Sequence, residues 1–537
     1  MGIKNFLPKS VVLFVILRLH FSSDPFVVAS TSTNSICDIT PFPSFCKYFL
    51  RHNESTNTYN SGKLSIHLSL SATTHFLNLI NSYLNSKNAS NYDQSTIYVL
   101  QDCQLLLDLN LDFLSNVNGI TSQTGNTLRG SKFDDVETLL SASITNQQTC
   151  LDSLQITPSA SNIKNDIFGI LTNGSMMYSV SLALFKNGWH PNQRSRGGRK
   201  LLQICGSAVN MTQMVVVNQD GSGNYTTIND AIAAAPNNTK AGNGYYMIYV
   251  VAGVYQEYVS IASNKKYLMI VGDGINKTII TGNRSVVDGW TTFNSATFVV
   301  GGQGFLGVNI TVQNTAGATK HQAVAVRNGA DLSTFYNCSF EGYQDTLYTH
   351  SLRQFYRECD IYGTVDFIFG NAAVVFQNCN IYPRLPLQGQ FIAITAQGRT
   401  DVNQNTGTSI HNCTIQAAAD LASSNGTTKT YLGRPWKEYS RTVYMQSFMD
   451  SLINPAGWAA WSGDFALSTL YYAEYNNTGP GSNTSNRVTW PGYHVIDSTN
   501  ASTFTVSNFI VGDFWLPDTT VPYTGGLLSA KMFMTLY

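Results

Sequence analysis

The sequence has little charge for its length. Lys, Arg, Asp and Glu make up 12% of its 537 residues, and 32 basic side chains balance 32 acidic ones, so the formal net charge is zero. A protein that coats nucleic acid or adheres to a membrane through a polybasic segment has a surplus of basic residues. We therefore expect no nucleic-acid partner, and we expect any charged ligand to be bound by a few local residues.

Long apolar runs are also scarce. The N-terminal run 11–17 follows Lys4 and Lys9 and is far shorter than the roughly 20 residues that span a bilayer. A basic start, a short apolar run and small residues around Ala29 are typical of a signal peptide. We expect residues 1–30 to be a signal peptide, the protein to be secreted, no later segment to be apolar enough to cross a membrane, and the mature protein to have no membrane partner.

Cysteine is sparse, and no Cys-x-x-Cys spacing of the zinc or redox type occurs. The nine cysteines form two sets, Cys37, Cys46, Cys103 and Cys150, then Cys205, Cys338, Cys359, Cys379 and Cys413. Disulfides in an oxidising compartment are the better interpretation. Because nine cysteines cannot all form pairs, one is left without a disulfide partner, and Cys205 is the candidate. Asn-x-Ser/Thr sequons also fit a secretory pathway, for example at Asn53, Asn88, Asn173, Asn276 and Asn425.

The first third of the chain has a helical period. Apolar residues recur at intervals of three and four in the segments 64–84, 105–117, 133–144 and 163–184, which polar segments such as 118–131 separate. Together with a short hairpin that carries Cys37 and Cys46, this pattern predicts an all-α four-helix bundle. A chain of this length exceeds what one core supports, so we assign residues 31–185 to a first domain.

The period stops in a basic segment, residues 186–202, which is rich in Gly, Pro, Asn and Arg. Such a segment is typical of an exposed linker that proteases cut, although a solvated spacer is the alternative. The rest of the chain divides into a second domain, residues 203–527, and a C-terminal tail, residues 528–537.

The second domain has short β-rich runs, such as 247–251, 267–271 and 297–300, and a phased repeat. Similar segments surround Cys338, Cys359, Cys379 and Cys413, and the first three of these cysteines are 21 and 20 residues apart. Periods near 20 with short strands predict an all-β parallel solenoid, in which each turn stacks on the one before.

The repeat places two carboxylates at the same phase. Asp345 is seven residues after Cys338, and Asp366 is seven residues after Cys359. They should stand on adjacent turns, about 4.8 Å apart along the stack. Two carboxylates so close cannot both ionise easily, which predicts an acid beside a nucleophile or base. The alternative is an Asp that caps a loop in each turn.

Further side chains could complete a site. Gln344 directly precedes the first carboxylate and Gln322 lies about one turn earlier, so their neutral amides could stabilise an oxyanion, or could merely form a glutamine ladder. Arg434 can hold a carboxylate with two hydrogen bonds. Trp436 and Phe369 offer flat faces for sugar rings, although either could belong to the core.

Five motifs follow one another in this region: Gly253-Val254-Tyr255-Gln256-Glu257, Gln322-Ala323-Val324-Ala325-Val326, Gln344-Asp345-Thr346-Leu347-Tyr348, Asp366-Phe367-Ile368-Phe369-Gly370 and Leu432-Gly433-Arg434-Pro435-Trp436. In this order they resemble the motifs of plant pectin methylesterases, and the resemblance covers residues 215–527. The resemblance implies a right-handed parallel β-helix in the cell wall that hydrolyses pectin methyl esters to pectate and methanol. It implies no metal and no organic cofactor.

The resemblance also implies roles. Asp366 would be the nucleophile and Asp345 the proton donor and then the base, with Gln322 and Gln344 as the oxyanion hole. Arg434 would orient Asp366, while Thr292 and Trp436 would help to bind the galacturonate chain. In the family the cysteines that match Cys359 and Cys379 pair, whereas spacing alone equally allows Cys338 with Cys359.

The first domain resembles the plant invertase and pectin methylesterase inhibitor domain, whose four cysteines pair in chain order. That implies Cys37–Cys46 and Cys103–Cys150. Arg199-Lys200-Leu201-Leu202 resembles the basic processing site of such precursors. We therefore expect a processing protease to cut after Leu202, and we expect pectin and inhibitor proteins as further partners.

Two other functions fit parts of the pattern. A polygalacturonase or pectate lyase shares the solenoid and its acidic residues, but paired amide donors suit ester hydrolysis better than glycoside cleavage. A binding or inhibitory protein would use the helical domain and keep the solenoid only as a scaffold.

Overall fold

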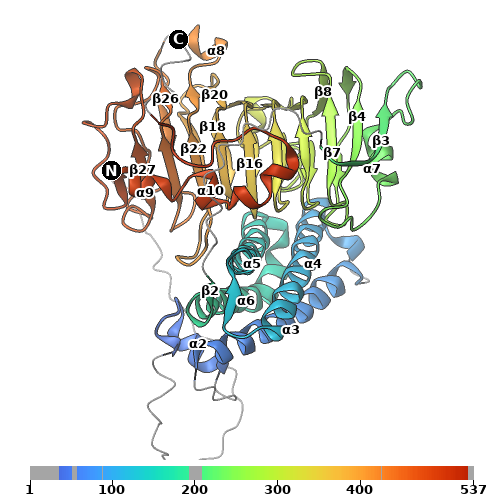
Figure 1. Cartoon of the computed structure of the whole chain (residues 1–537), viewed down its shortest axis with the longest axis vertical. Helices are drawn as coiled ribbons and strands as arrows, with labels where there is room; N and C mark the ends of the chain where they lie inside the picture. Colours follow the sequence, from blue (N-terminus) through green and yellow to red (C-terminus); the bar gives the residue numbers. More distant parts are fainter. Residues whose placement is uncertain (1–35, 51–56, 87–88, 193–208, 425, 530–537) are drawn as a thin grey trace, which may run out of the picture.

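The computed structural model describes residues 36–50, 57–86, 89–192, 209–424 and 426–529. A helical bundle lies against one side of a long stack of strands (Figure 1). The expected signal peptide, the processing site at Arg199–Leu202 and Cys205 lie outside the described residues.

The N-terminal unit is the expected four-helix bundle. Its long helices are α3 (Thr58–Leu84), α4 (Gln94–Gln123), α5 (Gly130–Ile156) and α6 (Ser161–Gly188), preceded by the short α2 (Pro43–Leu50). The expected disulfides Cys37–Cys46 and Cys103–Cys150 are both present. The strands β1 (Thr127–Arg129) and β2 (His190–Asn192) pair in parallel and tie the α4–α5 loop to the end of α6.

Two predictions about these helices are wrong. The segment 118–131 is not all loop, because α4 continues to Gln123, where the hydroxyls of Thr121 and Ser122 donate to carbonyls four residues earlier. The expectation that no later segment is apolar enough to span a membrane also fails for Pro158–Gly188. This helix meets the length and composition criteria, but 61% of its apolar window is buried, as expected for a core helix of the bundle.

The C-terminal unit is a parallel β-helix with three long sheets. The first contains, in spatial order, β28 (Tyr493–Val495), β27 (Tyr471–Tyr475), β25 (Arg441–Met445), β22 (Gly407–His411), β19 (Ala373–Gln377), β16 (Arg353–Arg357), β13 (Ser333–Tyr336), β10 (Leu306–Val308), β7 (Leu268–Gly272), β4 (Tyr245–Val250) and β3 (Met211–Val217).

The second sheet contains β26 (Phe448–Met449), β23 (Thr414–Ile415), β20 (Asn380–Pro383), β17 (Asp360–Gly363), β14 (Ser339–Glu341), β11 (Thr311–Asn314), β8 (Thr278–Gly282) and β5 (Gly253–Tyr255). The third contains β24 (Thr430–Gly433), β21 (Ile392–Gln397), β18 (Val365–Gly370), β15 (Leu347–Thr349), β12 (Val326–Asn328), β9 (Phe298–Val300) and β6 (Val259–Ile261). The short helices are α7 (Ile228–Ala234), α8 (Ala419–Ala422), α9 (Ser498–Ser502) and α10 (Val506–Phe509).

The strand register follows the predicted repeat. Phe335 pairs with Tyr356, Tyr356 with Phe376 and Phe376 with Ile410, one residue from each turn. The rings of Phe335 and Tyr356 stack at 5.4 Å, and those of Tyr356 and Phe376 at 4.7 Å. The core is therefore a column of equivalent side chains buried between the sheets.

A left-handed residue marks the same corner of successive turns. Asn337, Glu358, Asn378 and Asn412 have φ of 52°, 54°, 57° and 54°, and each directly precedes a cysteine of the repeat. Asparagine tolerates this conformation better than other side chains that carry a Cβ. The Asn412 amide also donates to Asn378 Oδ1 at 2.8 Å, so these two corners are bonded to one another along the stack.

The expected Cys359–Cys379 disulfide is not formed, and that prediction is wrong for this structure. Cys338, Cys359, Cys379 and Cys413 are buried free thiols. Cys359 Sγ lies 3.5 Å from the carbonyl oxygen of Phe335, and Cys379 Sγ lies 3.5 Å from that of Tyr356. Each thiol thus donates to a backbone carbonyl near the preceding turn, which satisfies it without a covalent partner.

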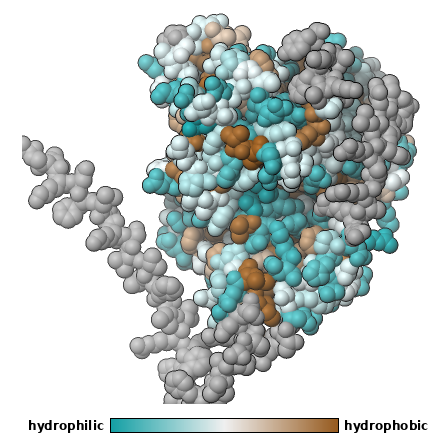
Figure 2. Space-filling view, turned by 60° about the vertical axis from the view of Figure 1, so that its left-hand side comes forward, coloured by the Kyte–Doolittle hydropathy of each residue, from teal (hydrophilic) through white to brown (hydrophobic). Residues whose placement is uncertain are grey.

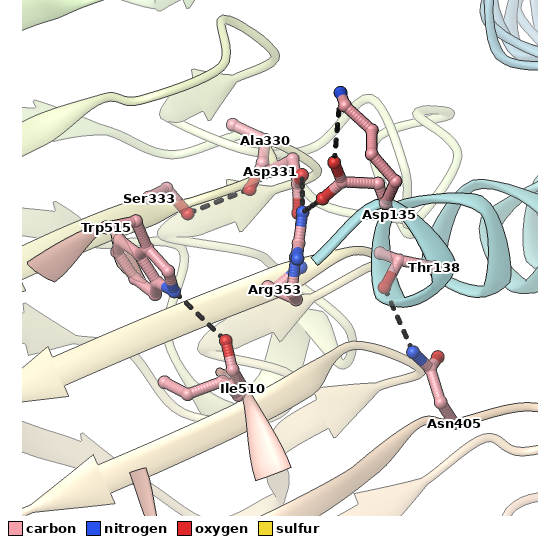
Figure 3. Close-up of polar contacts among 10 residues, drawn as sticks. Asp135, Thr138, Ala330, Asp331, Ser333, Arg353, Asn405, Ile510 and Trp515 are labelled. Carbon is pink, nitrogen blue, oxygen red and sulfur yellow. Dashed lines mark hydrogen bonds and ion pairs between the residues drawn. The ribbon is translucent and has the colours of Figure 1, made fainter. Parts of the chain in front are cut away.

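The C-terminal segment covers the outer face of the first sheet. Val506, Ile510 and Leu516 pack on Phe355 and Val375, and Trp515 Nε1 donates to the carbonyl of Ile510 at 3.0 Å (Figure 3). At the start of the expected tail, the Leu528 backbone exchanges two hydrogen bonds with the Gln446 side chain. Residues 530–537 lie outside the described residues.

Candidate active site

The two predicted carboxylates occupy equivalent positions on adjacent turns. Asp345 lies two residues before Leu347 of β15, Asp366 lies two residues before Ile368 of β18, and Leu347 pairs with Ile368. Both aspartates adopt the left-handed conformation, with φ of 64° and 53°. The pairing of β18 with β21 also shifts register between Val365 and Ile368. Strained backbone and bulges of this kind aim side chains at functional sites.

Arg434 holds one of the two carboxylates. Its Nε donates to Asp366 Oδ1 at 2.7 Å and its Nη2 to Asp366 Oδ2 at 2.6 Å. The guanidinium carbon lies 4.2 Å from the ring centroid of Trp461 and 5.4 Å from that of Phe391. Arg434 immediately follows β24, so the third sheet carries both partners of this ion pair.

The environment separates the protonation of the two aspartates. Burial, and then the charge of Asp366, raises the pKa of Asp345 well above its ordinary value, and Arg434 opposes this only in part. Burial also raises the pKa of Asp366, but the hydrogen bonds and charge of Arg434 counteract the shift. Asp345 is therefore the group that retains a proton, while Asp366 is the carboxylate stabilised in its ionised form.

The two predicted glutamines flank this pair. The backbone nitrogen of Ala323 donates to the Gln344 carbonyl at 3.2 Å, which places Gln322 and Gln344 on adjacent turns. Both side chains are half-buried. Neither side-chain amide has a hydrogen-bond partner among the described residues, so their N–H groups remain available as donors.

The two aromatic residues that the sequence singled out, Phe369 and Trp436, contact one another. Phe369 stacks on Tyr348 at 4.2 Å, and Trp436 meets the edges of both rings at 6.0 and 6.4 Å. Tyr348 was not singled out from the sequence, although it lies 21 residues before Phe369, which is the same spacing as between the two aspartates. The last predicted residue, Thr292, is half-buried, and its carbonyl accepts from Ser295 Oγ at 2.9 Å. It adjoins Phe293, whose ring meets that of Tyr348 at 6.4 Å.

The helical bundle lies over these rings. From α5, Thr145 accepts from Asn371 Nδ2 at 2.9 Å and Thr149 shares a hydrogen bond of 3.0 Å with His350. Apolar side chains of α3, α4, α5 and α6 form one cluster with Tyr348, Phe369 and Trp436. A cavity of about 10 Å³ remains between α5 and the rings. That is about enough for one water molecule, so no sugar ring can enter there while the bundle is in place.

Polar contacts extend this interface on both sides of the rings. Arg353 donates to Asp331 of the β-helix at 2.7 Å and to Asp135 of α5 at 2.8 Å, and Asn405 donates to Thr138 at 3.0 Å (Figure 3). In α4, the Asp102 carboxylate accepts from Thr291 at 2.6 Å and from the Asn294 amide. Tyr98 of the same helix stacks on Trp290 at 4.4 Å.

Hydrophobic residues gather only in small separate patches on the surface face that Figure 2 displays, between hydrophilic ones. The aromatic rings of the site contribute little to exposed surface, because Tyr348 and Phe369 are 4% and 5% exposed in the full chain.

The fold and the site define an enzyme built on a parallel β-helix with a two-carboxylate centre. A family model described as Pectinesterase matches residues 214–513, and one described as Plant invertase/pectin methylesterase inhibitor matches residues 31–184. The chain belongs to the pectinesterase family and is a carboxylic ester hydrolase.

Curated relatives align over almost the whole chain. The "Probable pectinesterase/pectinesterase inhibitor 20" of Arabidopsis thaliana is 55% identical, covering 97% of this chain and 100% of the relative. "Pectinesterase 2" of Citrus sinensis is 48% identical, covering 98% of this chain and 100% of the relative. A solved pectin methylesterase from carrot is 56% identical with a TM-score of 0.58, and it corresponds to 60% of this chain and 100% of its own.

Proposed function

We propose that the β-helix domain hydrolyses the methyl esters of polygalacturonate in the cell wall, after secretion, and releases methanol and pectate. Membership of the pectinesterase family supports the reaction. The observation that carries the mechanism is the bidentate Arg434–Asp366 pair beside Asp345, whose raised pKa keeps it protonated.

In the first half-reaction, an oxygen of the Asp366 carboxylate attacks the carbonyl carbon of the methyl ester. Arg434 keeps this carboxylate ionised and fixes its plane. The oxyanion that forms accepts hydrogen bonds from the Gln322 and Gln344 amides. As the intermediate collapses, the bond from carbon to methoxy oxygen breaks, and the proton of Asp345 passes to that oxygen, so methanol leaves and an acyl-enzyme remains.

In the second half-reaction, Asp345 is ionised and acts as the base. It takes a proton from a water molecule, whose oxygen attacks the acyl carbon and expels the Asp366 carboxylate. The galacturonate leaves with a free carboxyl group, and Asp345 is protonated again. Phe369, Trp436 and Thr292 are the residues that we assign to binding the polysaccharide, because Phe369 and Trp436 contact one another, and Phe293, the neighbour of Thr292, contacts Tyr348 of the same aromatic cluster.

We further propose that the full chain is a latent precursor. The bundle covers the aromatic rings and leaves no room there for a sugar, which supports inhibition in cis. A protease that cuts after Leu202, at Arg199-Lys200-Leu201-Leu202, would separate the bundle, residues 31–185, from the esterase, residues 203–527. Separate inhibitor proteins with a similar bundle could occupy the same face afterwards.

Methanol release from highly methyl-esterified pectin tests both proposals. The proteins to compare are the 203–537 fragment, the full chain and the fragment with Asp366→Asn. The carrot enzyme corresponds over its full length to 60% of this chain, about the size of the fragment, which supports folding of the fragment on its own. We expect an active fragment, a full chain at least about tenfold slower, and a variant slower by about 10⁴-fold because it lacks its nucleophile.

Asp518→Asn, the same change at an exposed position of the C-terminal segment on the first sheet, is the matched control and should retain the fragment's activity. An inactive but folded parent fragment would contradict esterase activity and favour a polysaccharide-binding protein. Shortening of the polymer without methanol would instead favour a polygalacturonase or lyase. Equal activity of fragment and full chain would contradict latency alone.

A further inference from the structure

An ion pair joins the bundle to the β-helix beside the cluster of aromatic rings formed by Tyr348, Phe369 and Trp436, which we call the aromatic cleft. Lys437 Nζ lies 2.7 Å from Asp152 Oδ2 and 2.8 Å from Asp152 Oδ1, so one ammonium group meets both oxygens of a carboxylate on α5. Gln148 Nε2 also donates to Asp152 Oδ1 at 2.8 Å, which holds the carboxylate in place. Both side chains of the ion pair are only 20% exposed, so water screens the attraction less than at an open surface.

Lys437 belongs to the substrate side of this interface. It follows Trp436 directly, lies three residues beyond Arg434, and its Nζ is 5.3 Å from the Trp436 ring centroid. Together with Trp436 and Tyr348 it lines the small cavity that remains between α5 and the cleft. A polysaccharide that replaced the bundle over these rings would pass beside this ammonium group.

Departure of the bundle affects the cleft's cations unequally. Arg434 retains Asp366, and Arg353 retains Asp331, because both of those carboxylates belong to the β-helix. Arg327 retains its bond to the Phe293 carbonyl but loses the nearby charge of Asp102 on α4. Lys437 loses Asp152, its carboxylate partner in a direct ion pair. The released enzyme therefore presents the Lys437 ammonium group without its carboxylate partner beside the aromatic rings.

We propose that Lys437 binds the free carboxylate of a galacturonate that neighbours the ester under attack, and that Asp152 imitates this carboxylate in the full chain. This inference rests on the proposed function. A methyl-esterified galacturonate is neutral, whereas a de-esterified one carries a charge at the same position. An ammonium group at this subsite distinguishes the two, so the enzyme favours esters beside residues that it has already de-esterified.

Direct binding tests the subsite without relying on catalysis. The probe is an unesterified hexagalacturonate, titrated calorimetrically into the 203–537 fragment. We expect Lys437→Gln to weaken binding about five- to tenfold and Lys437→Arg to restore most of it, since one partly buried charge-assisted contact has about that value. Lys240→Gln removes an exposed lysine at another part of the β-helix and is the matched control. Equal affinities of the parent fragment and Lys437→Gln would overturn the inference.

Kinetics on two pectins supply the second readout. On half-esterified pectin, Lys437→Gln should raise KM about fivefold with kcat unchanged, and on almost fully esterified pectin it should change neither constant. An equal increase in KM on both substrates would overturn the inference, since a merely structural role predicts that result. Failure of the parent fragment to release methanol would count against the proposed function instead, and the binding experiment would still decide the role of Lys437.

The full chain tests whether Asp152 takes the place of a galacturonate carboxylate at Lys437. Asp152→Asn should loosen the bundle and raise the methanol release of the uncleaved chain several-fold, and hexagalacturonate should then inhibit that activity by occupying the vacated subsite. Asp112→Asn, at an exposed position of α4, should change nothing. An Asp152→Asn chain that stays as latent as the parent would contradict the role assigned to this ion pair.

Discussion

At the scale of single residues, the same side chain performs two different tasks. Asp345 and Asp366 share the left-handed conformation, the phase in the repeat and nearly complete burial. What distinguishes them is Arg434, which binds only Asp366. An arginine that stabilises one carboxylate in its charged form leaves the other to carry the proton, and so divides the pair into a nucleophile and an acid.

Replacing that arginine tests this division. We expect Arg434→Lys to lower kcat about 10²-fold with little change in KM, because an ammonium group cannot make the two parallel hydrogen bonds of the guanidinium. With weaker stabilisation of its anion, the pKa of Asp366 rises, so the acid limb of the kcat profile moves to higher pH. The measurement is methanol release by the 203–537 fragment across pH.

Arg357→Lys, whose arginine contacts Glu358 and Gln377 on another sheet, is the control and should behave as the parent. A kcat within twofold of the parent and an unmoved acid limb in Arg434→Lys would contradict the assigned role.

At the scale of structural elements, each turn of the solenoid depends on a corner that few residues can form. Asn337, Asn378 and Asn412 adopt positive φ, and the side chain of Asn412 also bonds to the corner before it. A residue other than glycine or asparagine is strained there by about 1–2 kcal/mol. The asparagines therefore favour the corner on three of these turns, and Glu358 adopts it with φ of 54° on the turn that carries Asp366.

Asn412→Ala should thus destabilise the β-helix by about 2 kcal/mol, from backbone strain and a lost hydrogen bond together. Asn412→Gly, which relieves the strain and lacks only the bond, should recover about half of that loss. The measurement is the unfolding midpoint of the 203–537 fragment in guanidinium chloride. Equal midpoints for the parent and both variants would show that the corner does not limit stability.

At the scale of the whole molecule, docking of the bundle is linked to protonation. Burial raises the pKa of Asp102 to about 7, against the hydrogen bonds of Thr291 and Asn294 and the charge of Arg327. Since docking raises this pKa, the stabilisation of the docked state by Asp102 is fully present below about pH 4 and is lost as pH rises through 7. His350, which bonds to Thr149, has the opposite effect on docking. Burial lowers its pKa to about 3, so the need to keep this ring neutral disfavours docking in acid.

Asp102→Asn isolates the first of these effects, since the effect of His350 is common to both proteins. Asparagine imitates the protonated acid, so the docking constant of the parent divided by that of the variant should fall about tenfold per pH unit between pH 4 and 7. The ratio of fragment activity to full-chain activity reports docking at each pH. Asp112→Asn is the control. A ratio of docking constants that does not vary with pH would contradict a proton on Asp102 in the docked state.

The periodic features of this protein could be predicted from its sequence. The cysteine spacing of 21 and 20 residues predicted the stacked turns, and the shared phase of Asp345 and Asp366 placed both on one side of the stack. Phase alone did not decide chemistry: it left the cysteine pairing open, and the family pairing of Cys359 with Cys379 proved wrong because backbone carbonyls satisfy the thiols.

Nothing in the sequence predicted that the helical bundle docks on the β-helix. Asp152 and Lys437 are 285 residues apart, and Thr145 and Asn371 are 226 apart, with no repeat that relates them. The amino-acid sequence by itself determined the two folds and the carboxylate pair, because local hydrophobic periods and the stacking of equivalent residues depend only on order along the chain. Only the tertiary structure decided that the bundle fills the cleft and that Asp152 meets Lys437, because shape and charge complementarity between two finished surfaces exists only once both have folded.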